Sequence, residues 1–316
     1  MTRWQSNAVL TFVCLIWGSA FVGQAWGMSS LGPLWFTGIR FLMGAATITP
    51  LVWLELRRVA RREGLEPTRQ RLRHGLGLGV LVWLGACLQQ AGIVHTSVTH
   101  AGFLTTLYVP LVPLLVWMLF RQRPHWSVWP TMVASLIGLW LLTGEVNLTQ
   151  LNPGDALVLA SVIPWALHVV MVGHWAGHSQ RPLLLAWLQF VVCGLLSMAT
   201  GAVLEPVSWS GVQTAMGALL YTGVLSVGVG YTLQVVVQRH TQATDAAIIL
   251  TSETLFAALA GAIFMGDRLG LAAWAGCGLI LLGVVAVQLV PLLERQRPNA
   301  PPPTADQAPE VPPAHP

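Results

Sequence analysis

The chain has 316 residues and only 9% of them are charged, whereas a soluble domain carries roughly 25%. Hydrophobic residues make up 54% and the mean hydropathy is +0.65, which excludes a soluble enzyme, a disordered protein and a secreted disulfide scaffold. The four cysteines lie singly inside apolar runs, which is typical of buried thiols and not of a zinc or disulfide set.

Ten apolar stretches follow one another along the chain, each close to the roughly 20 residues that a bilayer-crossing helix needs. They predict an all-α polytopic membrane protein with ten transmembrane helices. The predicted spans are 6–26, 33–54, 76–95, 99–120, 127–144, 155–174, 183–204, 212–236, 244–265 and 271–293.

The arginines set the expected orientation. All 16 basic residues are Arg, and 14 of them fall on one side of the membrane when the N-terminus is placed inside. Only Arg268 lies in an outer loop, and Arg40 lies within the second span. Because short Arg-rich loops stay cytoplasmic, both termini are predicted to be cytoplasmic.

Two segments stand outside this pattern of spans. The charged loop 57–74 holds seven arginines, which act either as a topology determinant or as a surface for acidic lipid or a partner. The Pro-rich tail 294–316 is expected to be disordered and cytoplasmic. The net charge of +4 is spread too thinly to predict a nucleic-acid partner.

An internal repeat relates the two halves of the chain. A shift of 145 residues aligns His95 with His240, Thr106 with Thr251 and Trp129 with Trp274, and a slightly larger shift aligns Trp17 with Trp165. The repeats are predicted over 6–144 and 155–293. Each holds five spans, and because five is odd the copies must be inverted relative to each other. Many secondary transporters have this architecture, with the substrate site at the repeat interface.

Several short motifs occur along the chain. They are Ile-Trp-Gly-Ser-Ala-Phe at 16–21, Arg-Phe at 40–41, Gly-Asp-Ala at 154–156 with Pro-Trp-Ala at 164–166, and Ser-Glu-Thr at 252–254 followed by Gly-Asp-Arg-Leu at 266–269. These motifs resemble those of the EamA-type members of the drug/metabolite transporter superfamily. The resemblance covers residues 6–293 and is greatest to amino-acid exporters of the YddG type.

The resemblance implies two EamA repeats in a bacterial inner membrane and movement of small metabolites such as amino acids. The expected partners are a small-molecule substrate and membrane lipid, with no cofactor, and the chain is expected to work as a monomer. Nucleotide-binding and catalytic motifs are not found in the sequence, so transport is expected to be passive, exchange-based or ion-coupled, and the protein is not expected to be an enzyme. A membrane-embedded enzyme and a non-transporting receptor or scaffold remain the alternatives.

Two charged residues lie deep in the predicted spans, where an unpaired charge is costly. Glu253, near the membrane midplane, either contacts a substrate amine or carries a coupling proton, or it pairs structurally, for example with Arg40. Arg40 either holds a substrate carboxylate or serves as a structural pairing group.

Uncharged candidates complete the predicted substrate site. Trp17 and Trp165 occupy pseudo-symmetric mid-span positions and are candidates for two aromatic walls of a cavity. The remaining predicted lining residues are polar groups at comparable depth, namely Ser19, Gln90, Tyr108, His168, Tyr231 and Gln234. Each of these also has a packing or backbone-capping interpretation.

Overall fold

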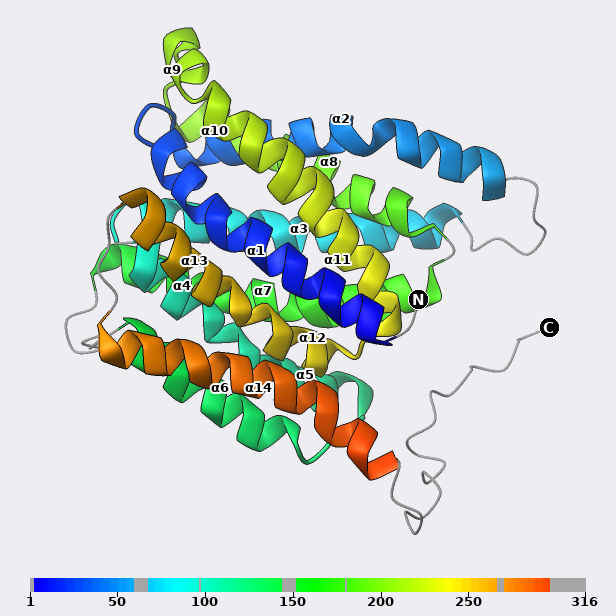
Figure 1. The fold of residues 1–316 in the computed structure, drawn as a ribbon. Helices are drawn as coiled ribbons and strands as arrows, with labels where there is room; N and C mark the ends of the chain where they lie inside the picture. The colour runs from blue at the N-terminus through cyan, green and yellow to red at the C-terminus, as the bar shows by residue number, and fades with distance from the viewer. Residues whose placement is uncertain are drawn as a thin grey trace.

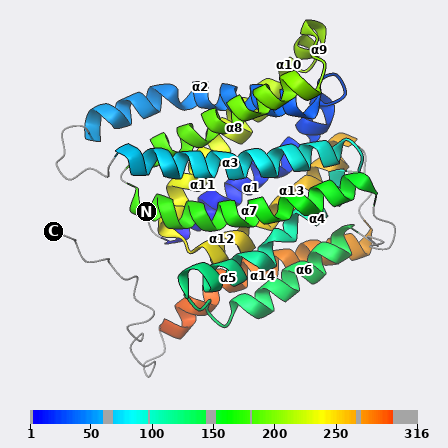
Figure 2. The same cartoon turned by 180° about the vertical axis from the view of Figure 1, so that it is seen from behind.

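The computed structural model describes residues 3–59, 68–96, 98–143, 152–179, 181–265 and 270–295. Every element assigned in these ranges is a helix. Figures 1 and 2 show a bundle in which the long helices run across the view in both directions. The predicted all-helical fold is confirmed, and its ten apolar helical segments stand at the ten predicted positions.

The first half of the chain supplies five of these segments. They are α1 (Arg3–Gly27), α2 (Pro33–Val59), α3 (Thr68–Ile93), the pair α4 (Val98–Thr106) and α5 (Tyr108–Phe120), and α6 (Val128–Thr143).

The second half supplies the other five. They are α7 (Pro153–His178), α8 (Pro182–Leu204), the run α10 (Met216–Leu220), η2 (Tyr221–Tyr231), α11 (Thr232–Val237) and η3 (Gln238–His240), the run α12 (Ala243–Leu250), α13 (Ser252–Ala260) and η4 (Gly261–Met265), and α14 (Leu271–Arg295). A short helix, α9 (Trp209–Thr214), precedes the eighth segment. In the described ranges eight segments are long and apolar enough to cross a membrane, and Val128–Leu141 and Leu271–Ala286 are shorter apolar stretches.

Three predicted boundaries need correction. The stretch 57–74 is not one loop, because α2 continues to Val59 and α3 already begins at Thr68, with arginines in the end turns of both helices. The eighth span starts at Met216 and not at 212, because α9 is a separate turn. The tail is described only to Arg295, the end of α14, so its predicted disorder lies outside the described residues.

The fourth and ninth segments are both interrupted near their middle. The break falls at Leu107 in one and at Thr251 in the other, within one residue of equivalence under the 145-residue shift. In the first case Pro110 has no N–H to donate to the carbonyl of Thr106, which favours an interruption of the helix at this turn. These breaks place Tyr108 and Glu253 in the first turns of α5 and α13.

Helix contacts are reciprocal between the two halves. The pairs α2–α8 and α6–α14 join equivalent helices, and α3 packs on α7 as η2 and α11 pack on α1. Figure 1 shows α6 beside α14 at one edge of the bundle and α2 with α8 at the other. The division into repeats over 6–144 and 155–293 remains a prediction, and this reciprocity supports it.

Two glutamates join α2 and α8 at their opposite ends. Glu55, near the end of α2, accepts hydrogen bonds from the backbone N–H groups of Leu183 and Leu184 at 3.1 and 2.9 Å. Glu205, at the end of α8, accepts from those of Leu34 and Trp35 at 3.0 and 3.2 Å. The first N–H groups of a helix have no partner within it, so each carboxylate caps the neighbouring helix across the repeat boundary.

Candidate functional site

A central cavity lies where α1, α3, α7, η2 and α13 meet. Its volume is about 50 Å³, which is enough to hold several water molecules. Its lining comes from both halves of the chain. The lining residues are Trp17, Phe21, Gln24, Arg40, Gln89, Thr105, Tyr108, Trp165, His168, Val169, Ser226, Tyr231, Gln234, Leu250 and Glu253.

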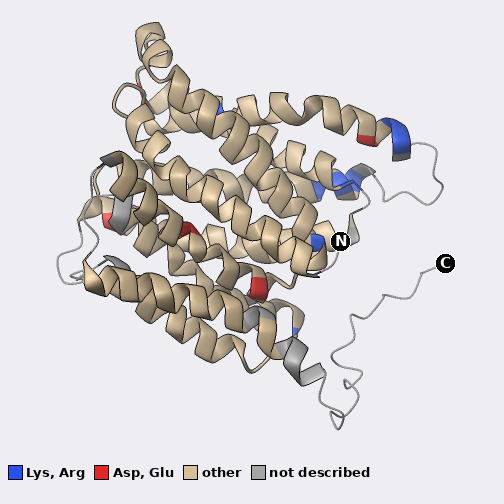
Figure 3. Cartoon of the chain, in the orientation of Figure 1, with Lys and Arg blue, Asp and Glu red and all other residues tan. Residues whose placement is uncertain are grey.

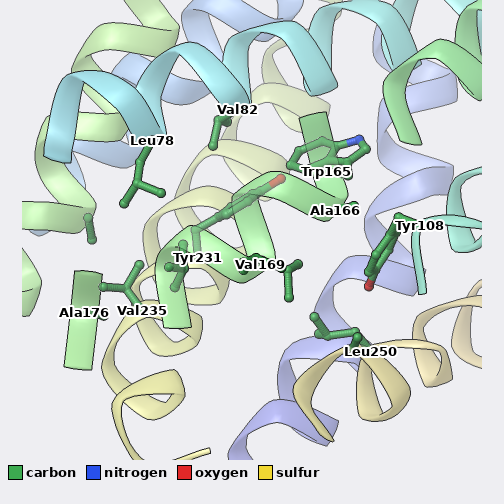
Figure 4. Close-up of a cluster of buried hydrophobic side chains, with 14 of the residues drawn as sticks. Leu78, Val82, Tyr108, Trp165, Ala166, Val169, Ala176, Tyr231, Val235 and Leu250 are labelled. Carbon is green, nitrogen blue, oxygen red and sulfur yellow. The ribbon is translucent and has the colours of Figure 1, made fainter. Parts of the chain in front are cut away.

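Tyr231 is the centre of an aromatic cluster on one wall. The ring centroids of Trp17 and Trp165 lie 4.6 and 6.3 Å from that of Tyr231, and His168 meets it edge-on at 6.2 Å. Figure 4 shows Trp165, Tyr231 and Tyr108 on separate segments of the bundle, with Val169 between the two tyrosines. The cluster forms a continuous aromatic surface suited to apolar or cationic groups.

Trp17 is fixed by the unusual geometry of η2. Its indole N–H donates to the carbonyl of Ser226 at 3.0 Å. The π-helical turns of η2 are wider than α-helical turns, and such turns often occur at functional sites. A Cβ added at Gly230 would lie 2.6 Å from the Trp17 ring nitrogen, so only glycine permits this approach.

Glu253 reaches the cavity because α1 and α13 lie very close together. A Cβ added at Gly18 would lie 2.6 Å from the Glu253 carbonyl and the Ala257 amide, so this glycine fixes the contact. The carboxylate of Glu253 lines the cavity and makes no hydrogen bond or ion pair with any described residue. A charged group in this position is available to a ligand.

Arg40 lines the same cavity but has a different setting. It is 3% exposed, and its guanidinium donates to the Oε1 atom of Gln90 at 3.4 Å. The guanidinium carbon of Arg40 lies 5.7 and 5.2 Å from the ring centroids of Phe36 and Phe41. No ion pair joins Arg40 and Glu253 in the described structure, so the suggested pairing of these two residues is not what the structure shows.

Polar side chains around the cavity hold one another in place. Gln89 donates to Thr105 at 2.8 Å, and His168 lies 2.8 Å from the Oε1 atom of Gln189. The indole nitrogen of Trp165 and the Oε1 atom of Gln234 are buried without a hydrogen-bond partner in the described part of the chain. These two groups add unused hydrogen-bonding capacity to the walls.

The structure brings together eight of the ten predicted site residues. Ser19 and Gln90 are the two that do not line the cavity. The Ser19 hydroxyl is hydrogen-bonded at 2.6 Å to the hydroxyl of Tyr221. Gln90 accepts a hydrogen bond from the guanidinium of Arg40 and donates one to the sulfur of Met28 at 2.8 Å. The functional roles of all ten residues remain predictions.

Four polar lining residues were not among the predicted set, namely Gln24, Gln89, Thr105 and Ser226. Gln24 and Gln89 are also mid-span polar residues, so the depth criterion that selected Gln90 applied to them as well. Ser226 contributes through its backbone carbonyl, for which the sequence carries no signal.

The fold and the cavity define the class of the protein. It is a multi-pass helical membrane protein in which both halves line one central, partly polar cavity. The EamA-like transporter family model matches residues 6–144 and 152–289. The chain therefore belongs to the EamA-like transporter family.

Curated relatives agree with this assignment. An uncharacterized transporter of Archaeoglobus fulgidus is 27% identical over 287 residues, covering 91% of this chain and 87% of the relative. The uncharacterized inner membrane transporter YedA of Escherichia coli is 27% identical, covering 87% and 88%. The threonine/homoserine exporter RhtA of Salmonella typhimurium is 27% identical over 176 residues, covering 53% and 56%.

A solved crystal structure shares the fold. Its TM-score is 0.73, and the match covers 90% of this chain and 97% of that chain at 17% sequence identity. This likeness concerns the arrangement of the helices. Together with the family match, it confirms the predicted membrane transporter fold.

Proposed function

We propose that the protein is a secondary transporter that exports small metabolites, amino acids or related compounds, across the bacterial inner membrane by alternating access. Both termini lie in the cytoplasm in this proposal, and the protein performs no catalysis. Rocking of the two repeats about the central cavity opens it to each side in turn.

The observation that carries the proposal is that Glu253 and Arg40 line one cavity without pairing with each other. An amino acid carries an ammonium and a carboxylate group. A site that binds it therefore needs one negatively and one positively charged side chain. Glu253 is the partner for the ammonium group and Arg40 the partner for the carboxylate. The name of the relative RhtA, a threonine/homoserine exporter, supports the same substrate class.

The aromatic wall adds a further element. Trp17, Tyr231 and Trp165 present ring faces to the same space, where an apolar side chain or a cation packs favourably. A proton on Glu253 would neutralise its carboxylate between transport steps, which makes this residue the candidate for coupling as well as for binding.

Flux measurements test the proposal. Purified full-length protein is reconstituted into liposomes loaded with a panel of labelled amino acids, and efflux is followed with and without a proton gradient. We expect efflux of at least one amino acid to exceed the efflux from loaded liposomes that contain no protein. An absence of flux across the panel, while the purified protein still binds a partner protein, would favour the receptor alternative. Chemical conversion of a panel member would favour the enzyme.

A further inference from the structure

Three neutral polar side chains line a part of the central cavity to which the proposed function gives no role. They are Gln24 on α1, Gln89 on α3 and Thr105 on α4, and they are 6%, 7% and 8% exposed. We call these three residues the amide subsite. Polar groups buried to this extent are normally hydrogen-bonded, so one that has no protein partner indicates a place for a group of the ligand.

The amide subsite has unused hydrogen-bonding capacity. The side chain of Gln24 makes no hydrogen bond within the described ranges, so its amide N–H groups and its amide oxygen are both available in the cavity. The Nε2 atom of Gln89 donates to the Thr105 hydroxyl at 2.8 Å, and that hydroxyl donates to the carbonyl of Ala101 at 2.7 Å. These two hydrogen bonds fix the amide of Gln89 and leave its oxygen as a free acceptor.

The amide subsite lies away from the aromatic wall. Trp17, Phe21 and Gln24 all line the cavity and are four and three residues apart, so they share one face of α1. Trp17 belongs to the aromatic wall, and Gln24 lies seven residues further on, about 10 Å along the helix axis. Phe21 packs in a buried cluster with Leu104, the residue before Thr105. The subsite therefore lies where α1, α3 and α4 meet.

The charged residues of the cavity approach it between these two regions. The backbone of Glu253 meets α1 at Gly18, and Arg40 donates a hydrogen bond to Gln90, the neighbour of Gln89. Charges are sparse along the bundle in Figure 3, where most of the basic residues lie near the ends of α2 and α3. An amino acid held by Glu253 and Arg40 can direct its side chain either to the aromatic wall or to the amide subsite.

The two regions differ in how strongly they discriminate between side chains. An aromatic surface accepts many groups with similar energy. A buried amide disfavours any ligand that displaces its water without replacing the hydrogen bonds. Selection among substrates is therefore stronger at the amide subsite than at the aromatic wall.

We infer that the amide subsite selects amino acids whose neutral side chain both donates and accepts hydrogen bonds, as a hydroxyl or a carboxamide does. The inference rests on the proposed transport of amino acids. Gln24 offers a donor and an acceptor, and Gln89 adds a fixed acceptor, so such a group can satisfy both residues. An aliphatic side chain of the same size leaves these amides unpaired.

Efflux of near-isosteric amino acids from liposomes tests the inference. Threonine and valine form one pair, and asparagine and leucine form the other, each labelled and loaded at equal concentrations that do not saturate the full-length protein. The variants are Gln24→Leu and Gln89→Leu. Gln238→Leu is the matched control, because Gln238 is a buried glutamine that does not line the cavity. The ratio of rates within a pair is measured, since a smaller amount of folded protein leaves that ratio unchanged.

We expect the wild type to move the polar member of at least one pair about tenfold faster than its aliphatic partner. A preference in the threonine pair alone assigns the subsite to hydroxyl groups, and one in the asparagine pair alone assigns it to carboxamides. The ratio should fall towards one in Gln24→Leu and Gln89→Leu and persist in Gln238→Leu. If Gln89→Leu does not fold because Thr105 loses its donor, Gln24→Leu still reports on the subsite.

Two kinds of failure can be told apart. Wild-type flux without a preference for the polar members, or a preference that persists in Gln24→Leu, overturns the inference and leaves the proposed function intact. An absence of flux for every amino acid removes the proposed function, and this inference with it.

Discussion

At the scale of single residues, the carboxylate of Glu253 is a deep charged group for which the described part of the chain shows no hydrogen bond or ion pair. We therefore expect Glu253→Gln to reduce amino-acid flux in liposomes by at least about tenfold, since hydrogen bonds to charged groups contribute roughly 1.5–3 kcal/mol. The unfolding temperature should not fall, because the substitution breaks no hydrogen bond within the described structure and removes a charge from a membrane-spanning segment.

The conservative variant Glu253→Asp serves as the control for this prediction. It keeps the charge and shortens the side chain, so partial flux is expected. Wild-type flux from Glu253→Gln at every pH would remove Glu253 from both binding and coupling.

The two pseudo-symmetric tryptophans offer a matched pair for a second prediction. Trp17 donates a hydrogen bond to Ser226, whereas the indole nitrogen of Trp165 is buried without a described partner. Both Trp→Phe changes remove similar volume, but only Trp17→Phe removes a hydrogen bond. It should cost about 1 kcal/mol more of the free energy of unfolding than Trp165→Phe.

Thermal unfolding midpoints in one detergent measure this difference. The midpoint of Trp17→Phe should lie below that of Trp165→Phe. Equal midpoints, or the reverse order, would mean that ring packing and not the indole hydrogen bond decides the stability of the cavity wall.

At the scale of helices, the reciprocal capping of α2 and α8 joins the two halves of the chain. Each glutamate places a negative charge at a helix N-terminus, where the free N–H groups and the helix dipole favour it. We expect Glu55→Gln and Glu205→Gln each to destabilise the protein by about 1 kcal/mol, because an amide keeps one acceptor oxygen and loses the charge.

The double variant sharpens this test. The two caps are about 20 residues apart along α2, or roughly 30 Å, so their effects on the unfolding midpoint should add. A double variant no less stable than the worse single variant would show that the caps act as one cooperative unit.

At the scale of the whole molecule, the membrane explains why the helices were predictable. A chain in hydrocarbon must satisfy its backbone hydrogen bonds within each segment, so apolar length alone indicates a helix. The interruptions within these helices were harder to predict from the sequence. Pro110 signals the break at Leu107, but no proline stands near the equivalent break at Thr251, and the π-turns of η2 have no motif. Packing between helices decides these features.

The sequence predicted the membrane depth of the cavity-lining residues but not the direction in which each side chain points. Polar residues far from both membrane faces point inward because hydrocarbon would not solvate them, and this criterion found Trp165, His168 and Glu253. It does not state which way a side chain turns. Ser19 is two residues from Trp17, about 200° around the helix, and Gln90 is about 100° from Gln89, so each faces away from the cavity.

The orientation of the whole molecule is the last property that the arginines predict, and it can be measured. Arg58 is exposed at the end of α2, and Ser210 is exposed in α9, which follows Glu205 at the opposite end of the α2–α8 pair. Single cysteines at these positions, introduced as Arg58→Cys and Ser210→Cys, report on the two faces. Because Arg-rich segments remain cytoplasmic, a membrane-impermeant maleimide should label only Ser210→Cys in intact spheroplasts and both variants after permeabilisation. Of the native cysteines three are buried and Cys87 is partly buried, so the unmodified protein provides the blank. Labelling of Arg58→Cys from outside would show the opposite orientation, with the arginine-bearing end of α2 on the outer face.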